Sequence, residues 1–241
     1  MRVRELSVFF PAYDEEANIE RTVMRALEVL HALPLERFEV VVVDDGSSDA
    51  TPTIVDGLAA AHAEVRAVHH ATNQGYGAAL RSGFEAARLG WVFFSDGDGQ
   101  FDFGELTRFL EVADDAEVVV GYRTNRADHV GRRINTWLWG VLIRWAFRLP
   151  VRDVDCAFKL LSRDVLDRVG PLSSSGAMIS TELLARIHRA GIPIVELGVH
   201  HYPRLGGRPT GASVRVIARA FCELAVLRWQ LWRCPRAAGG C

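Results

Sequence analysis

The sequence has few cysteines and almost no net charge, and both absences narrow the classes of protein it can encode. Four cysteines occur in 241 residues and none forms a C-x-x-C pair; they are Cys156, Cys222, Cys234 and Cys241. A chain of this length builds its core without covalent staples, so we expect reduced cysteines and a cytoplasmic setting. The formal net charge of −2 provides no basic field for nucleic acid, and no nucleic-acid partner is expected.

Long hydrophobic runs are also lacking. No stretch reaches the roughly 18 uncharged apolar residues that a membrane-spanning helix requires. The nearest candidates are residues 136–147, interrupted by Arg144, and residues 213–232, interrupted by three arginines and Glu223. The run Leu6–Phe10 is too short for a signal peptide and no small-residue cleavage site follows it. We therefore expect neither a spanning helix nor a cleaved leader.

Apolar runs of strand type alternate with segments of helical periodicity in the first half of the chain. The predicted strands cover residues 6–10, 38–43, 65–69, 91–95 and 117–120, and the predicted helices cover 15–31, 49–62 and 77–88. Continuous apolar strands separated by helices predict an α/β fold, with a mainly parallel sheet covered by helices on both faces. Ligands of such sheets bind at the carboxyl ends of strands.

Two carboxylates one residue apart follow the fourth predicted strand, in the run Ser95-Asp96-Gly97-Asp98-Gly99-Gln100. The glycines let both carboxylates turn towards one ion, and Gln100 adds a neutral oxygen. Hard oxygen ligands suit Mg²⁺ or Mn²⁺, with a diphosphate completing the coordination shell. The alternative is a solvated Asp-Gly turn. Because other acidic residues end neighbouring strands, we predict that Asp96, Asp98 and Gln100 bind a metal ion.

Asp44 and Asp45 directly follow the second predicted strand. Their carboxylates can accept hydrogen bonds from a ribose hydroxyl and from a base N–H. Helix capping is the alternative, and it accounts for the nearby Asp49 but not for the pair. We therefore predict that Asp44 and Asp45 bind a nucleotide.

Two further segments follow the first and third predicted strands. After the first strand and Pro11, Tyr13 can lie against a nucleobase and Glu15 can reach a base or ribose; the alternative is a helix start with favourable acids. The glycine-rich run from Asn73 to Gly83 has the wrong spacing and position for a dinucleotide fingerprint. We interpret it as close approach of the backbone to a nucleotide, or as tight helix packing.

In their order along the chain, these motifs resemble the family 2 glycosyltransferases of GT-A fold. The set comprises Pro11-x-Tyr13-x-Glu15, Asp44-Asp45-Gly-Ser-x-Asp49-x-Thr51, Asn73-x-Gly75-x-Gly77, Asp96-x-Asp98-x-Gln100 and Gly121-x-Arg123. Later stretches are similar to motifs of the dolichyl- or polyprenyl-phosphate sugar synthases: Asp153-x-Asp155-Cys156-Ala-Phe158-Lys159 and His201-Tyr-Pro-Arg204-x-x-Gly207. Two positions depart from that pattern, since Ala157 replaces a glycine and Arg208-Pro209-Thr210 replaces a Ser-Lys pair.

The resemblance implies an inverting transfer of a hexose, typically mannose or glucose, from GDP or UDP to a polyprenyl or dolichyl phosphate. It makes Asp98 and Arg204 the catalytic residues, with the metal ion neutralising the leaving diphosphate. An anionic acceptor needs no strong general base, which agrees with Ser180-Thr181-Glu182 standing where many relatives with hydroxyl acceptors carry an acid pair. The implied donor-binding residues are Pro11, Tyr13, Glu15, Asp44, Asp45, Asn73, Gly75, Asp96 and Arg204.

Two amphipathic segments, at residues 131–148 and 213–233, indicate contact with a membrane surface. The first mixes arginines with Trp137, Trp139 and Trp145, which suit the interface between water and acyl chains. The alternative is an ordinary pair of helices packed on the protein. With a lipid acceptor, we expect a cytoplasmic protein, peripheral at the inner face of the membrane, attached directly or through a membrane-protein partner.

Arginines between the fifth predicted strand and the first amphipathic segment predict the acceptor site. Arg123, Arg132 and Arg133 carry guanidinium forks that match phosphate geometry. We expect a catalytic domain at residues 1–211, including the helix at 131–148, and an amphipathic helix and tail at 212–241. Two alternatives stay open: transfer to a saccharide or small-molecule hydroxyl, and a non-catalytic protein that binds nucleotide sugars.

Overall fold

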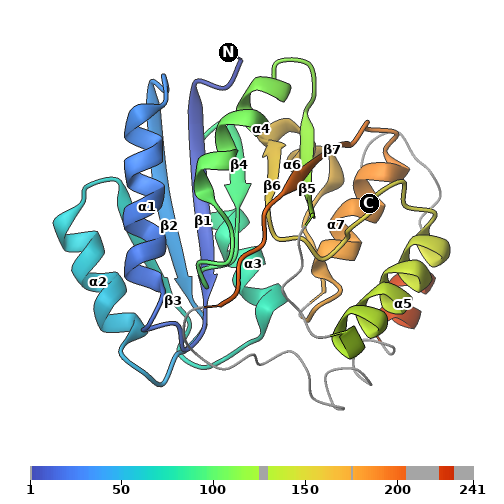
Figure 1. Ribbon diagram of the computed structural model, residues 1–241, viewed down its shortest axis with the longest axis horizontal. Coiled ribbons are helices and arrows are strands. Elements are labelled where there is room, and N and C mark those ends of the chain that lie inside the picture. Colours follow the sequence, from blue (N-terminus) through green and yellow to red (C-terminus); the bar gives the residue numbers. More distant parts are fainter. Residues whose placement is uncertain (1, 125–129, 175, 205–222, 231–241) are drawn as a thin grey trace.

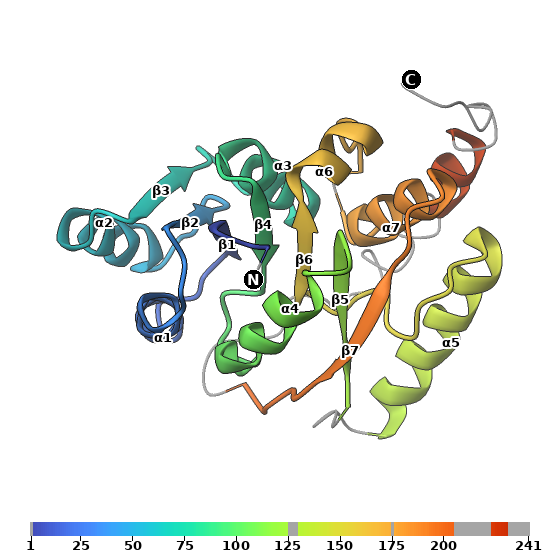
Figure 2. The same ribbon diagram turned by 90° about the horizontal axis from the view of Figure 1, so that it is seen from above.

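The computed structural model describes residues 2–124, 130–174, 176–204 and 223–230, with the backbone alone for 130–138. Over these residues one sheet has the strand order β3-β2-β1-β4-β6-β5-β7 and carries helices on both faces (Figures 1 and 2). The predicted α/β fold is confirmed. The strands are β1 (Glu5–Ala12), β2 (Arg37–Asp44), β3 (Val65–His69), β4 (Trp91–Phe94), β5 (Val118–Arg123), β6 (Lys159–Ser162) and β7 (Val195–Val199).

The helices follow the strands along most of the chain. They are α1 (Ile19–Ala32), α2 (Thr51–Ala61), α3 (Tyr76–Ala86), the short 3-10 helix η1 (Phe103–Glu105), α4 (Leu106–Val112), α5 (Val130–Phe147), α6 (Arg163–Val169) and α7 (Ile179–Arg189). Residues 223–230, inside the second predicted amphipathic segment, are also helical.

Consecutive residues of the central strands pack into two separate cores, one on each face of the sheet. Val40 and Val42 of β2 join the core under α1, α2 and α4, whereas Val41 and Val43 join the core under α3, α5, α6 and α7. Because side chains alternate along a strand, four buried valines in a row require helices on both faces. This is why an uninterrupted apolar run predicted a covered strand.

The strand β6 is antiparallel to both of its neighbours, β4 and β5, while the other described pairs of strands are parallel. In this register Lys159, the first residue of β6, lies opposite Phe94, the last residue of β4. The reversal brings the segment before β6 to the edge of the sheet where β1, β2 and β4 end. Neither β6 nor β7 was among the predicted strands.

The first strand is longer than predicted. We expected it to end before Pro11, but β1 continues to Ala12, and Pro11 pairs with Val43 in the parallel register. Pairing with β4 stops at Phe9, so Pro11 lies where β1 has one partner strand and its missing N–H costs no ladder bond. Helix α3 packs closely on β1. A Cβ on Gly83 of α3 would lie 2.3 Å from the Phe9 ring.

Glu182 of α7 fixes the segment before that helix through one fully buried carboxylate. The backbone N–H of Ser174 donates to Oε2 at 2.7 Å, the Ser173 hydroxyl to Oε1 at 2.9 Å, and Arg186 Nη2 to Oε1 at 2.6 Å. Burial alone would raise the pKa of Glu182, but the serine and arginine donors outweigh it and hold the pKa below its usual 4.5.

Changing Glu182 to Ala should lower the free energy of unfolding at pH 7 by about 3 kcal/mol, because buried donors lose their acceptor. The lowered pKa means that this contribution is present above pH 4.5 and is lost as the pH falls through the folded-state value. Urea denaturation at pH 7 and in acid measures both effects. The exposed Glu85→Ala change on α3 is the control, and an equal loss in both variants at pH 7 would contradict the assignment.

Candidate active site

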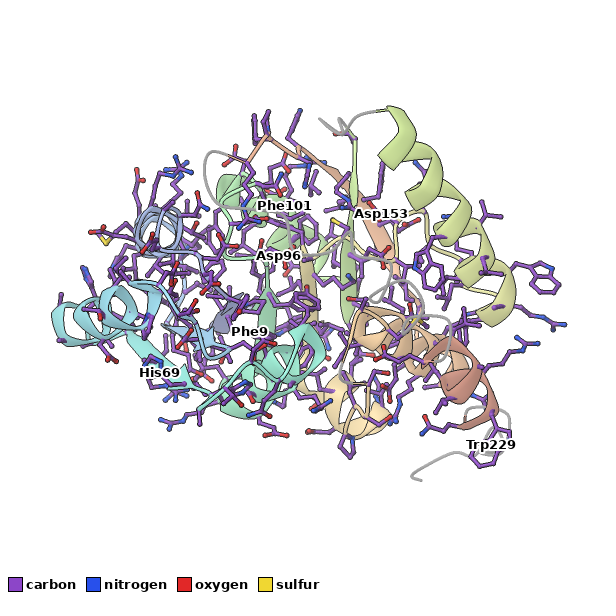
Figure 3. All side chains as sticks on the ribbon, turned by 90° about the horizontal axis from the view of Figure 1, so that it is seen from below. Phe9, His69, Asp96, Phe101, Asp153 and Trp229 are labelled. Atoms are coloured by element: carbon purple, nitrogen blue, oxygen red, sulfur yellow. The ribbon has the colours of Figure 1, made fainter. Side chains whose placement is uncertain are left out.

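Polar side chains from four segments meet at the edge of the sheet where β1, β2 and β4 end. Glu15 follows β1, Asp45 follows β2, Asp96 follows β4, and Arg204 comes from the chain after β7. Figure 3 shows Asp96 close to the centre of the molecule. This is the edge at which the parallel strands predicted a ligand site.

Arg204 connects the chain after β7 to the segment that follows β1. Its Nη2 forms an ion pair with Glu15 Oε1, and its Nη1 lies 4.0 Å from Asp98 Oδ2. Asn18 Nδ2 donates to the second oxygen of Glu15 at 2.9 Å. Burial raises the pKa of Glu15, although the hydrogen bond from Asn18 and the charge of Arg204 act against that shift. One guanidinium therefore lies between the carboxylates of two strand ends.

The position of Arg204 depends on a short pairing between two loops. Phe101 and His201 form an antiparallel bridge, and Tyr202 N donates to Gln100 O at 2.8 Å. The Gln100 side chain completes this pairing, because Nε2 donates to Tyr202 O at 2.9 Å. The amide oxygen of Gln100 is then the atom left for a cation.

Asp96 and Asp98 form a closely spaced acidic pair with shifted pKa values. Burial, and then repulsion from Asp98, raise the pKa of Asp96 to about 7. Burial also raises the pKa of Asp98. Tyr76 Oη donates to Asp96 Oδ1 at 3.0 Å and fixes that carboxylate. Sequence reasoning missed Tyr76, which starts α3 within the glycine-rich run.

This donor set fits a divalent cation. Two carboxylates and an amide oxygen are hard ligands of the kind that Mg²⁺ and Mn²⁺ prefer, and a cation would offset the repulsion that raises the pKa of Asp96. No cluster of three His, Cys, Asp or Glu side chains forms a metal site in the part of the chain that the structure describes. The remaining coordination positions would fall to substrate oxygens and water.

A buried lysine lies close to Asp96. Lys159 is the single lysine of the 241-residue chain, and it is fully buried at the start of β6. Its Nζ donates to Cys156 O and, at 3.2 Å, to Val154 O. Burial lowers the pKa of Lys159, and nearby acidic groups including Asp153 and Asp96 act against that shift. The sequence signal that could have identified Lys159 is that the chain contains no other lysine.

Asp45 is buried and binds the start of the glycine-rich run. Gln74 N and Gly75 N donate to its two carboxylate oxygens at 2.9 and 2.8 Å. His70 Nδ1 lies 2.6 Å from Oδ1, and His70 Nε2 lies 2.8 Å from Ser82 Oγ. His70 thus links Asp45 to Ser82 on α3. Asp45 thus positions the loop that leads to Tyr76. The sequence predicted neither this role nor the hydrogen bonds behind it.

Asp44 is held in a similar way on the other side of the strand end. It accepts a hydrogen bond from Ser47 N at 3.0 Å, and His69 Nδ1 lies 3.0 Å from its second oxygen. Gly46, in the turn from Asp44 to Ser47, has a positive φ of 68°, which glycine adopts readily. A Cβ at Gly46 would lie 2.4 Å from the Thr72 backbone. Figure 3 shows His69 well away from Asp96.

The remaining predicted donor residues lie around the same strand ends. Pro11 is buried in β1, Tyr13 is half-buried just beyond it, and Asn73 is exposed in the loop that Asp45 holds. The structure therefore brings Glu15, Asp98 and Arg204 into one group and places the Asp44–Asp45 pair beside it. The nucleotide-binding roles of all these residues stay predictions.

Of the three arginines predicted to bind an acceptor phosphate, the structure describes the side chain of one. Arg123 at the end of β5 forms a two-pronged ion pair with Asp153, with Nε–Oδ2 and Nη2–Oδ1 distances of 2.7 and 2.8 Å. A phosphate at Arg123 would compete with that carboxylate. The side chains of Arg132 and Arg133 lie outside the described residues, so their role stays a prediction.

The acidic pair has a consequence for stability. Because the folded-state pKa of Asp96 is about 7 and its usual value is 3.8, folding takes up a proton and stability falls as the pH rises between them. The Asp96→Asn variant, which resembles the protonated form, should therefore melt at a higher temperature than the wild type at pH 8. Its advantage should narrow towards pH 5. Thermal melts with the exposed Asp167→Asn as control check this, and a lower melting temperature at pH 8 contradicts it.

Similarity to known proteins agrees with this geometry. The chain is 33% identical over 240 residues to glycosyltransferase AglD of Haloferax volcanii, over 96% of this chain and 38% of AglD, so it spans less than half of that relative. It is 28% identical over 226 residues to polyprenol monophosphomannose synthase of Mycolicibacterium smegmatis, over 86% of this chain and 82% of that protein.

A solved structure shows the same fold. Glucosyl-3-phosphoglycerate synthase from Mycobacterium tuberculosis, in complex with Mn²⁺ and uridine-diphosphate-glucose, aligns with a TM-score of 0.71 at 20% identity, over 93% of this chain and 79% of that chain. The expected GT-A fold is confirmed. Residues 7–170, more than half of the chain, match the family model described as glycosyl transferase family 2. The chain is therefore a member of glycosyl transferase family 2.

Proposed function

We propose that this protein transfers a hexose from a nucleoside-diphosphate sugar to a polyprenyl or dolichyl phosphate, with inversion and with Mg²⁺ or Mn²⁺. The observation that carries the proposal is the Asp96–Asp98 pair with raised pKa values, next to Arg204 at the carboxyl edge of the sheet. The similarity of the chain to polyprenol monophosphomannose synthase and to dolichyl-phosphate beta-glucosyltransferases supports this class of acceptor.

The donor would lie across the strand ends. Asp96, Asp98 and Gln100 would hold the metal ion, which supplies positive charge to the leaving diphosphate. Arg204 faces both Asp98 and Glu15, so its guanidinium is placed to bind the same diphosphate. The nucleoside would bind around Pro11, Tyr13, Glu15, Asp44, Asp45, Asn73 and Gly75.

The buried state of Glu182 on α7 favours an anionic acceptor. Transfer to a hydroxyl is assisted by a general base that takes its proton, and many relatives with hydroxyl acceptors carry an acid pair at this place. Glu182 is fully buried and already accepts hydrogen bonds from two serines and Arg186, and these donors lower its pKa. An acceptor that is already anionic removes that need, and Arg123, Arg132 and Arg133 would bind its phosphate.

Domain boundaries and location belong to the same proposal. The catalytic domain would comprise residues 1–211, with residues 212–241 forming an amphipathic helix and tail. Among the helices that the structure describes, none is long and apolar enough to cross a membrane. A lipid acceptor would bring the protein to the inner face of the membrane as a peripheral protein, directly or through a membrane-protein partner.

The proposal is tested by turnover with GDP- and UDP-sugars, a short polyprenyl phosphate and Mn²⁺. The wild type should form a sugar-phosphate lipid, and Asp98→Asn should reduce the rate at least a hundredfold because the diphosphate loses its bound cation. Circular dichroism checks that the variant is folded. Undiminished turnover by Asp98→Asn after EDTA treatment and restoration of Mn²⁺ would refute the metal assignment, and transfer only to hydroxyl acceptors would refute the lipid phosphate.

The acceptor site is tested with the double variant Arg132→Ala/Arg133→Ala. Loss of two guanidinium groups should raise the KM for polyprenyl phosphate about a hundredfold, because each hydrogen bond to a charged group contributes about 1.5–3 kcal/mol. Nucleotide affinity, measured by calorimetry, should stay unchanged. The matched control is Arg4→Ala/Arg37→Ala, two exposed arginines at the amino ends of β1 and β2. Equal KM values in both double variants would move the acceptor phosphate elsewhere.

A further inference from the structure

Large apolar side chains are exposed on one flank of the molecule, away from the site. The described residues include six such side chains, and four of them lie on α5 and on the helix at 223–230. Their exposed fractions are 37% for Val141, 77% for Trp145, 54% for Val226 and 51% for Trp229. We call these four residues the tryptophan patch. Figure 3 shows Trp229 at the periphery, far from Asp96 and directed outwards.

The two helices of the patch are joined to each other and to the core. Arg228 Nη1 donates to the backbone oxygen of Ala146, so the neighbours of Trp229 and Trp145 in sequence are in direct contact. Leu227 and Ile143 are buried in the same core beneath. Both helices therefore have a buried side and an apolar exposed side, and the exposed side is not needed for packing against the sheet.

Two exposed arginines border the patch. Arg148 and Arg228 are exposed, and among the described residues no carboxylate forms an ion pair with either of them. Arginine and tryptophan side chains together are typical of the interface between water and lipid, where the indole ring lies at the headgroups and cations meet anionic lipids. A protein partner would need carboxylates opposite both arginines, whereas an anionic lipid surface supplies negative charge everywhere.

We propose that the tryptophan patch docks the protein onto a lipid bilayer that contains anionic headgroups, with Trp145 and Trp229 inserted at the interface. Figure 1 shows α5 beside α7 on the flank of the molecule opposite α1 and α2. Docking through α5 would thus hold the bilayer against that flank. The inference rests on the proposed function for its purpose, but its test does not.

The test is sedimentation of the full chain with vesicles of phosphatidylcholine mixed with phosphatidylglycerol. The wild type should bind with a blue shift of its tryptophan fluorescence, and Trp145→Ser/Trp229→Ser should weaken binding at least tenfold. Arg148→Ala/Arg228→Ala should lose the preference for mixed vesicles over pure phosphatidylcholine. The control is Met24→Ser, an exposed apolar residue on α1 at the opposite end of the sheet, which should bind like the wild type.

Folding and function are separated by two further measurements. Circular dichroism, together with the single Trp145→Ser variant at the most exposed position, shows whether lost binding reflects lost structure. Turnover with a water-soluble, short polyprenyl phosphate should be unchanged in the tryptophan double variant. A wild type that turns over this acceptor but does not bind vesicles overturns the docking surface alone. Vesicle binding through the patch without any turnover overturns the proposed function alone.

A second copy of the chain is the other occupant of the tryptophan patch to be tested, and the oligomeric state tests it. Sedimentation velocity of the wild type should show no self-association that the tryptophan changes abolish. A dimer that Trp145→Ser/Trp229→Ser dissociates, in a protein that ignores vesicles, would make the patch a contact between copies and would overturn the proposal.

Discussion

The candidate site depends on cations held among several buried carboxylates. Lys159 Nζ binds the carbonyls of Val154 and Cys156, and Lys159 lies beside the end of β4, just before Asp96. Together with Arg123, which pairs with Asp153, the charge of Lys159 acts against the burial that raises the pKa of Asp96. The antiparallel course of β6 delivers this cation, because it starts the strand at the edge where its neighbour β4 ends. The local reversal in the sheet therefore has an electrostatic purpose.

The same edge is held together by contacts between segments that are distant in the chain. Arg204 bonds to Glu15, Asp45 bonds to the loop before α3, and Tyr76 of that helix bonds to Asp96. A disturbance at the Asp45 end can therefore reach the acidic pair through the start of α3. Nucleotide and metal positions, if occupied as we propose, would be mechanically coupled through one short loop.

The sequence predicted those features that local pattern controls. Buried apolar runs located the central strands, and the polar residues just after them located Asp96 and Asp45, because a parallel sheet collects its strand ends at one edge. It did not predict β6, whose four residues carry no periodicity, or the pairing of Tyr76 with Asp96, which depends on how α3 packs. Arg204 was identified through family resemblance alone, since nothing local links it to Glu15, 189 positions away.

The single lysine has a practical consequence for chemical labelling. All other basic side chains of the 241 residues, histidines aside, are arginines, and the only side-chain amine is fully buried. Acylating reagents and amine cross-linkers thus find no side-chain amine on the surface of the folded chain. Reaction of these reagents with Lys159 requires β6 to separate from its neighbouring strands. The rate of acylation at Lys159 would therefore report how often this part of the sheet opens.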